Sequence, residues 1–255
     1  MSQLAINVVG DELEEAADFC RSEDLGLEVT HFAFTDNLDR DLRESIERHK
    51  RVVTGIKPLI SHAPFLDLIT TSRDKEIINI CRRRHSEALH ASFEIGAQFY
   101  IAHTNFNQLI KEGLYRKMFA ERTLDFWLPL VDEAAERNVI ITLENIWDPY
   151  PDIQAEIVTK ANHPNLRVSF DNGHALVFSD IPAQKWIETF GSMLVHCHLH
   201  DNSGESDEHK PIGDGKENWP DLIAALRQRS PGAIMVAESD SLKNNKISIE
   251  RLRKM

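Results

Sequence analysis

Carboxylate and imidazole side chains recur at one point of the sequence pattern, directly after short apolar runs. They are His62, His103, Glu144, Asp171, His174, His198, His200, Asp201 and Glu238. Imidazoles and carboxylates that converge without thiolates suit a hard or borderline divalent ion such as Mn²⁺, Zn²⁺, Mg²⁺ or Co²⁺. The spacing therefore predicts metal chemistry, provided that the fold brings the ends of these runs together.

Each of these residues also has an ordinary structural interpretation. A glutamate at a strand end often forms a cap or an ion pair, and a lone buried histidine is usually a hydrogen-bonded core residue. Six runs in the same phase favour a shared site. His196 lies one pleat deeper than His198 and is interpreted as a core histidine, whereas His200 contacts either substrate or solvent. Cys197 alternates with these histidines, so it should face the helices as a packing residue.

The elements that position these residues are short β-branched runs alternating with amphipathic stretches. The predicted strands are Leu4–Val9, Leu27–Phe32, Lys57–His62, Phe99–His103, Val139–Glu144, Leu166–Asp171, Met193–His200 and Ala233–Glu238. The predicted helices are Glu12–Arg21, Asp39–Arg51, Asp74–Ile95, Leu114–Arg137, Asp152–Ala161, Ala183–Phe190, Trp219–Arg229 and Ile247–Leu252. Four histidines of the helices and loops are expected at the surface: His49, His85, His90 and His163.

Strict alternation of strand and helix implies parallel pairing through right-handed crossovers. Eight such units in about 250 residues match the size of a TIM barrel. A doubly wound open sheet is the alternative, although it would more often use fewer strands at this length. Because no linker or second composition regime interrupts the chain, we expect one α/β domain, a (β/α)8 TIM barrel, over residues 1–255.

The composition describes a soluble globular protein with an acidic surface. The chain has 255 residues, 29 basic and 41 acidic side chains, a formal charge of −12, and 42% hydrophobic residues. This balance disfavours a nucleic-acid partner, since such affinity comes largely from Lys and Arg. The three cysteines predict no disulfide framework, and the N-terminal segment predicts neither a signal peptide nor a membrane anchor. A cytoplasmic protein is therefore expected.

Six segments resemble a known family, the xylose isomerase-like TIM barrels, which include endonuclease IV and the sugar isomerases and epimerases. These segments are SHAPFLDL (61–68), LEN (143–145), SFDNGHA (169–175), HLHDN (198–202), DEHKPIGDG (207–215) and VAES (236–239). They occur in the family's order, from about the third strand to the eighth. The resemblance implies a metal-dependent enzyme on a (β/α)8 barrel.

The sugar epimerase branch of this family implies one set of roles. Its pattern makes Glu144, Asp171, His198 and Glu238 the ligands of one divalent ion, and makes the two glutamates the catalytic residues that exchange protons with substrate. His174 matches a substrate-binding histidine. That branch also tends to carry an arginine shortly after the strand-seven histidine. This chain has none there, which disfavours ketose 3-epimerase chemistry.

The endonuclease IV pattern implies a larger set, with nine ligands for three zinc ions. On this sequence they are His62, His103, Glu144, Asp171, His174, His198, Asp207, His209 and Glu238. The pair Phe65–Leu66 matches the aromatic–Leu pair that enters DNA in that enzyme. The rim loops of this chain carry Asp and Glu rather than basic residues, which favours a small substrate. We therefore expect Phe65 and Trp147 to form an apolar pocket wall.

The loop 204–215 has two interpretations that remain open. Amides around Gly213 and Gly215, with Lys210 or Lys216 nearby, could bind a phosphate group. The same loop could instead close over the metal as a lid. Trp219, at the start of the next helix, suits either stacking on a sugar ring or packing in the core or lid.

These observations lead to one main expectation and three alternatives. The expected function is a divalent-metal-dependent isomerase or epimerase of a small sugar, sugar phosphate or related polyol, acting by glutamate-mediated proton transfer through a metal-stabilised enediolate. The alternatives are an endonuclease IV-like zinc phosphodiesterase acting on abasic DNA, a metal-dependent keto-acid or inosose dehydratase, and a non-enzymatic binding barrel. The complete ligand set disfavours the last. Dimers and tetramers are common in the resembling families, but no interface is marked in this sequence.

Overall fold

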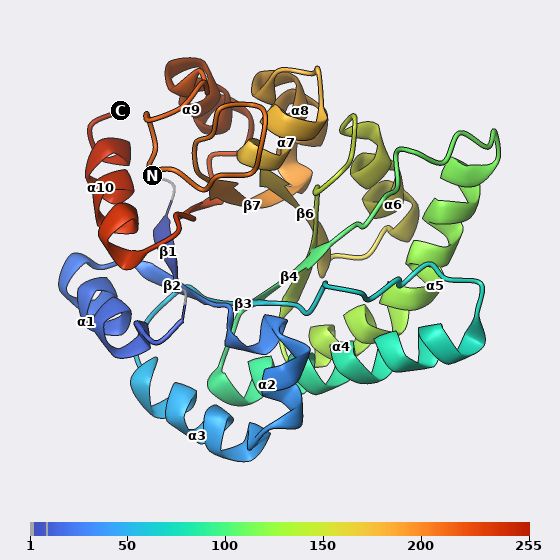
Figure 1. Cartoon of the computed structure of the whole chain (residues 1–255), viewed down its shortest axis with the longest axis horizontal. Helices are drawn as coiled ribbons and strands as arrows, with labels where there is room; N and C mark the ends of the chain where they lie inside the picture. The colour runs from blue at the N-terminus through green and yellow to red at the C-terminus, as the bar shows by residue number, and fades with distance from the viewer. Residues whose placement is uncertain (1–2, 9) are drawn as a thin grey trace.

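Eight parallel strands close into one barrel in chain order, with β8 hydrogen-bonded to β1 (Figure 1). The computed structural model describes residues 3–8 and 10–255. The strands are β1 (Leu4–Val8), β2 (Gly26–Val29), β3 (Leu59–His62), β4 (Phe99–His103), β5 (Ile140–Glu144), β6 (Leu166–Asp171), β7 (Leu194–Leu199) and β8 (Ile234–Ala237). The prediction of a (β/α)8 TIM barrel is confirmed. Val9, which the predicted first strand included, lies outside the described residues.

Helices surround the barrel in the described part of the chain (Figure 1). They are α1 (Leu13–Glu23), α2 (Thr35–Asp39), α3 (Leu42–Val52), α4 (Lys75–Ile95), α5 (Tyr115–Glu136), α6 (Asp152–Ala161), α7 (Asn172–Phe178), α8 (Ala183–Phe190), α9 (Trp219–Arg229) and α10 (Leu242–Leu252). Two 3₁₀ turns accompany them, η1 (His31–Ala33) and η2 (Gly191–Met193). The bounds of α6, α8 and α9 are the predicted ones.

Several local features differ from the sequence expectation, including helix α2, which was not predicted, and three others have a plain local reason. The second strand ends at Val29, because the following residues turn into η1. Helix α10 begins at Leu242, five residues earlier than predicted, where the Ser241 side chain accepts from the Asn244 amide. The sequence pattern does not predict helix α7, because seven residues are too few to show a helical period. Its N-cap is Asp171, which also ends β6.

The strands bury side chains on both faces, and the two faces form separate cores. Alternate residues such as Phe170, Cys197 and Leu199 belong to the large core between the strands and the helices. A smaller apolar cluster forms within the barrel: Ala5, Ile60, Ile101, Ile234 and Val236. Cys197 is fully buried in the larger core, which confirms that it is a packing residue rather than a ligand.

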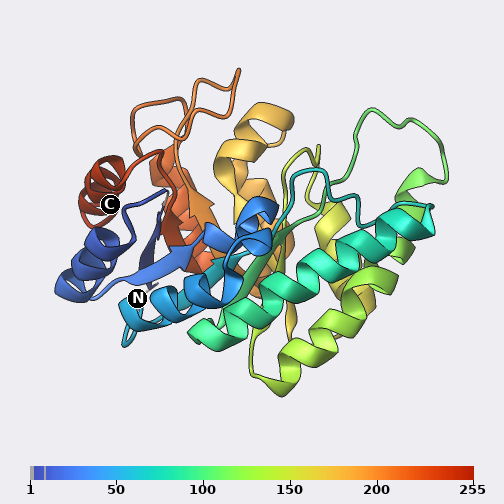
Figure 2. The same cartoon turned by 60° about the horizontal axis from the view of Figure 1, so that its bottom comes forward.

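The carboxyl ends of all eight strands lie on one side of the barrel, as parallel order requires. The long loops after β4 (green) and β7 (orange) rise on this side (Figure 2). This is therefore the face on which the strand-end carboxylates and histidines meet. No helix among the described residues is long and apolar enough to cross a membrane.

Candidate metal and active site

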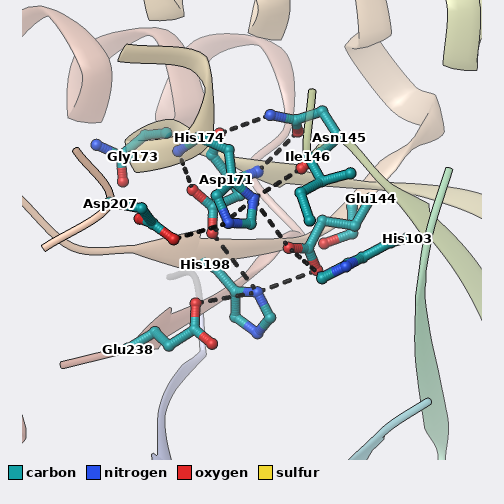
Figure 3. Close-up of polar contacts among 12 residues, drawn as sticks. His103, Glu144, Asn145, Ile146, Asp171, Gly173, His174, His198, Asp207 and Glu238 are labelled. Atoms are coloured by element: carbon teal, nitrogen blue, oxygen red, sulfur yellow. Dashed lines mark hydrogen bonds and ion pairs between the residues drawn. The ribbon is translucent and has the colours of Figure 1, made fainter. Parts of the chain in front are cut away.

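The strand ends bring the predicted polar residues into one cluster (Figure 3). His103 comes from β4, Glu144 from β5 and His198 from β7. Asp171 ends β6 and its Oδ1 accepts the His174 amide at 2.7 Å, so the cap of α7 fixes both residues. The nine residues predicted as candidate ligands fall into three neighbouring groups, two of which share Glu144.

The central group surrounds Nδ1 of His198. This atom lies 3.0 Å from Glu144 Oε2, 3.3 Å from Glu238 Oε2 and 3.9 Å from Asp171 Oδ2. All four side chains come from different strand ends, and His198 is fully buried. Glu144, Asp171 and His198 lie close enough together to hold a divalent ion, and Glu238 faces the same nitrogen.

Two further groups flank the central one. Glu144 is shared with the first of them, in which its Oε1 lies 3.4 Å from His103 Nε2 and His62 completes the set. The second is built around Asp207, whose Oδ2 lies 3.3 Å from His174 Nε2 and 3.1 Å from His209 Nε2. The structure therefore brings together all nine residues of the larger predicted set.

Three of the histidines are turned by hydrogen bonds to the backbone. Nδ1 of His62 donates to the Ala63 carbonyl at 2.8 Å, and Nδ1 of His174 donates to the Asn145 carbonyl at 2.8 Å. Nδ1 of His209 donates to the Glu238 carbonyl at 3.0 Å. In the neutral form of each ring the proton is therefore on Nδ1, and Nε2 presents its lone pair to the cluster. Metal-binding histidines are held in this way.

Buried polar atoms without a hydrogen-bond partner gather at the same point. Among the described residues they include both carboxylate oxygens of Glu144, Oε2 of Glu238 and Nδ1 of His198. A buried polar atom without a partner is costly, so such atoms are few in folded proteins. A cation between them would satisfy the carboxylate oxygens and the His198 nitrogen at once. The donor set therefore fits a divalent ion.

The two predicted catalytic glutamates differ in their electrostatic surroundings. Burial raises the pKa of Glu144, but the neighbouring imidazoles of His198 and His103 outweigh it and hold that pKa well below its usual range. Burial raises the pKa of Glu238 more strongly than the imidazoles of His198 and His209 lower it, and with the added effect of the Asp171 and Glu144 carboxylates the pKa reaches about 8. The two carboxyl groups thus differ in proton affinity.

The histidines respond to the same balance of burial and charge. Burial lowers the pKa of His62 to about 4. Burial would also lower the pKa of His174, but the carboxylates of Asp171 and Asp207 raise it to about 10. His209, beside Asp207 and Glu238, reaches a pKa of about 9 against the effect of burial. The carboxylates of Glu144, Glu238 and Glu28 likewise raise the pKa of His198 well above its usual range against burial, so the negative potential extends over the centre of the cluster as well.

A cavity of about 440 Å³ opens over the cluster. Glu144, Glu238 and His174 line it, together with the apolar side chains of Phe65 and Ile146. Trp147, predicted as a second aromatic wall residue, is not among the lining residues, and its side chain is 43% exposed. The neighbouring Ile146 lines the cavity instead. No lysine or arginine lines the cavity within the described chain.

Sequence reasoning gave no role to Glu28, which lies in β2. This carboxylate is fully buried and accepts hydrogen bonds from His196 and His198. The available signal was a single acidic residue between Leu27 and Val29 in an otherwise apolar strand. Asp148 was also missed: it is buried, accepts from Thr104 Oγ1 at 2.5 Å, and has a pKa that burial raises to about 7.

The burial of three other histidines differs from the sequence expectation or decides between its alternatives. His49 and His85 are buried rather than exposed, because their helices turn these positions toward the core. His200 is fully buried, with Nε2 3.2 Å from Asp171 Oδ2 and its ring stacked on that of His209 at 4.0 Å between centroids. It therefore braces the cluster rather than facing solvent.

The loop after β7 is held by protein groups. The backbone amide of Gly213 donates to Asp201, and Lys210 pairs with Glu208, so two of the groups considered for phosphate binding already have partners. Trp219 is buried and its Nε1–H donates to Asp201. Trp219 thus packs beneath the loop and is not a stacking surface in the cavity.

Comparisons with known proteins agree with this architecture. The model of the xylose isomerase-like TIM barrel family matches residues 23–255. The chain therefore belongs to the xylose isomerase-like TIM barrel family, as the sequence motifs predicted.

Individual relatives are distant. An uncharacterized protein of Methanocaldococcus jannaschii is 24% identical over 234 residues, covering 89% of this chain and 77% of its own length. The TTHB071 protein from Thermus thermophilus, in crystals soaked with ZnCl₂, has a TM-score of 0.82 at 24% identity, covering 99% of this chain and 97% of that one. A D-tagatose 3-epimerase-like protein has a TM-score of 0.77 at 21% identity, covering 99% and 96%. These likenesses concern the fold.

Proposed function

We propose that this chain is a divalent-metal-dependent isomerase or epimerase of a small sugar or related polyol. The observation that carries the proposal is the convergence of Glu144 and Glu238, from β5 and from the end of β8, on one cavity and on Nδ1 of His198. Two carboxylates that approach a bound molecule from different strands can remove a proton and return one. The cavity volume, about 440 Å³, suits a small molecule.

The proposed roles follow from these positions. Glu144, Asp171, His198 and Glu238 would hold the ion, which would supply positive charge to stabilise the negative charge that develops on substrate oxygens. Glu144 and Glu238 would exchange protons with the carbon next to the substrate carbonyl. His62, His103, His174, Asp207 and His209 would bind hydroxyl groups or a second ion. Phe65 would cover an apolar face of the substrate.

The side chains that line the cavity favour a substrate without a phosphate group. Four carboxylates surround the cluster (Glu144, Asp171, Asp207 and Glu238), and the described cavity lining offers neither lysine nor arginine. Lysine and arginine are the side chains that most often bind phosphate groups, and ionised carboxylates cannot donate hydrogen bonds to a phosphate dianion. The neutral sugar is therefore the preferred substrate class, ahead of the sugar phosphate.

The comparisons support the general class of enzyme that we propose, and they do not bear on its substrate. One structural neighbour is described as a D-tagatose 3-epimerase-like protein, and another was soaked with zinc chloride. We take from them that this barrel can carry sugar chemistry and that zinc is a reasonable first ion to test.

Deuterium exchange tests the proposal even while the product is unidentified. Metal-loaded protein would be incubated in D₂O with neutral ketoses, keto-inositols and their phosphorylated counterparts, and followed by proton NMR. We expect deuterium at the carbon next to the carbonyl for at least one neutral compound, with a new stereoisomer or isomer appearing. Elimination of water from the same compound would instead identify the dehydratase.

Glu144→Gln provides the matched variant. It should lower exchange by at least about 10²-fold, because the proton acceptor is lost, while the circular dichroism spectrum stays that of the barrel. Glu136→Gln, an exposed change near the end of α5, should leave exchange as in the wild type. Exchange at the wild-type rate in Glu144→Gln would contradict the assignment.

A second candidate, a multi-metal phosphodiesterase, is favoured by the three residue groups. His62, His103 and Glu144 form one group, and His174, Asp207 and His209 form another beside the central one. Three divalent ions would outweigh the four carboxylates and attract a phosphodiester. Elemental analysis after saturation with zinc decides between the two: one ion per chain and no cleavage supports the isomerase, whereas three ions and cleavage of abasic DNA supports the hydrolase.

A further inference from the structure

Glu28 lies in the barrel interior below the cluster, and no part of the proposed reaction uses it. Its neighbours Leu27 and Val29 belong to the core beneath the helices, so strand alternation turns Glu28 inward. The side chain is fully buried, and its partners His196 and His198 are fully buried as well. A carboxylate in such a place requires hydrogen bonds from its surroundings.

Both hydrogen-bond partners approach through the same ring atom. Nε2 of His198 lies 2.9 Å from Glu28 Oε2 and 3.0 Å from Oε1, and Nε2 of His196 lies 3.2 Å from Oε2. An ionised carboxylate only accepts hydrogen bonds, so each Nε2 must carry a proton. The buried partners hold the pKa of Glu28 far below its usual range despite burial.

This contact determines which nitrogen His198 presents to the cluster. With the proton held on Nε2, the lone pair of a neutral ring is on Nδ1, the atom that faces Glu144, Asp171 and Glu238. His62, His174 and His209 are oriented the other way round, by Nδ1–H bonds to backbone carbonyls. Of the four histidines, His198 is thus the one in which a carboxylate, that of Glu28, holds the ring nitrogen that faces away from the cluster.

His196 completes the arrangement from the far side. Its Nδ1 lies 2.7 Å from Ser169 Oγ, whose hydroxyl donates to it when Nε2 carries the proton. The rings of His196 and His198 meet nearly edge to face, 4.7 Å between centroids. Glu28 is therefore held in place by two imidazoles, of which only His198 reaches the cluster.

We propose that Glu28 is a positioning residue for the metal site: its carboxylate fixes the ring orientation of His198 so that Nδ1 is directed at the ion. The inference rests on the proposed metal dependence of the function. Carboxylates that accept from a metal-bound histidine also raise the basicity of the ligand, and their loss commonly weakens metal binding about 10- to 100-fold.

Zinc binding to the metal-free full chain tests this directly, by calorimetry or by competition with a chelating dye. Glu28→Leu removes both acceptors at similar size and should weaken zinc binding about 10- to 100-fold with unchanged stoichiometry. In Glu28→Gln, by contrast, the zinc affinity should be close to that of the wild type. Its amide oxygen can accept from His198 while its amide NH₂ donates to His196, which can move its proton to Nδ1 and donate to Ser169.

The outcomes separate this role from its alternatives. Wild-type affinity in Glu28→Leu, with only a lower melting temperature, would show a purely structural residue and overturn the proposal. Equal losses in Glu28→Leu and Glu28→Gln would show that charge alone matters, which also overturns it. A stoichiometry reduced by one ion would make Glu28 a ligand, since Glu28, His196 and His198 also lie close enough to hold a metal.

A spectroscopic measurement on the wild type covers the case in which Glu28→Leu does not fold. Long-range ¹⁵N–¹H spectra of the zinc-loaded protein should show a proton on Nε2 of His198 and none on Nδ1; the reverse pattern would overturn the proposal. Zinc binding without sugar turnover would contradict only the proposed function. Unchanged affinity in Glu28→Leu, with turnover intact, would contradict only the role of Glu28, and a wild type that binds no divalent ion would contradict both.

Discussion

The indole Nε1–H of Trp219 donates a 2.7 Å hydrogen bond to Oδ2 of Asp201, fastening the loop after β7 to the start of α9. The same buried carboxylate accepts the backbone amides of Gly213 at 2.9 Å and Glu217 at 3.1 Å. Asp207 and His209 lie within this loop. Asp201 therefore holds in place a segment that supplies one side of the site.

Replacing Asp201 by alanine should destabilise the protein and loosen this loop. Four donors would lose their acceptor, since the Asn202 amide donates to the same carboxylate, and each buried donor left without a partner costs about 1–3 kcal/mol. We expect the free energy of unfolding in urea to fall by about 3 kcal/mol or more, and limited proteolysis to cut within 203–217. Asp214→Ala, which removes an exposed pair with Arg251, should cost at most about 1 kcal/mol. Equal stability of the two variants would contradict this account.

Gly173→Ala should disturb the cluster through a steric clash. A Cβ built on Gly173 would lie 2.0 Å from Cε1 of His200, a ring that packs against Asp171 and His209. Since overpacking a buried site costs about 1–3 kcal/mol, the melting temperature should fall by several degrees and zinc affinity should decrease. Gly113→Ala, where a Cβ meets nothing within 4 Å, is the control. Wild-type zinc affinity in Gly173→Ala would argue against a bracing role for His200.

His85 should make the protein less stable as the pH falls. Burial lowers its pKa from 6.5 to about 3, so the folded state keeps this ring neutral while the unfolded chain takes up a proton. Below about pH 6.5 the unfolded state therefore gains protons that the folded state does not, and stability is lost until the folded pKa is reached. By about pH 4 this one group would contribute a loss on the order of 3 kcal/mol.

The measurement is urea unfolding at several pH values between about 4 and 7. The decline in stability over this range should be smaller in His85→Gln than in the wild type. His90→Gln, an exposed change in the same helix, should follow the wild-type decline. A decline in His85→Gln as steep as that of the wild type would show that the ring is protonated in the folded state.

Divalent ions should stabilise the folded chain, and chelation should reverse the effect. An ion that binds only the folded state at a free concentration of about 100 times Kd stabilises it by about 2.7 kcal/mol. We expect zinc to raise the melting temperature of the wild type and EDTA to restore the metal-free value. In Asp171→Asn the increase should be much smaller. An asparagine can still cap α7 but carries no charge for the ion.

The sequence alone was sufficient for the barrel and for most of the candidate ligands. Alternation of strand and helix is a local property, and parallel order places every strand end on the same rim. His103, Glu144 and Asp171 could therefore be placed together from their position after apolar runs. The motif of residues 207–215 added Asp207 and His209, which no strand pattern marks.

Tertiary structure decided the partners of these residues. Glu28 and His198 are separated by 170 positions in the chain, and only closure of the barrel brings β2 opposite β7. Sequence spacing also could not show that Asp201 accepts the hydrogen bond of the Gly213 amide, which a phosphate group was considered to accept. Nor could it show that the Trp219 side chain is buried beneath the loop. Local periodicity gives the face of a strand on which a residue lies. What that residue meets depends on side chains from distant strands, which only the closed barrel brings together.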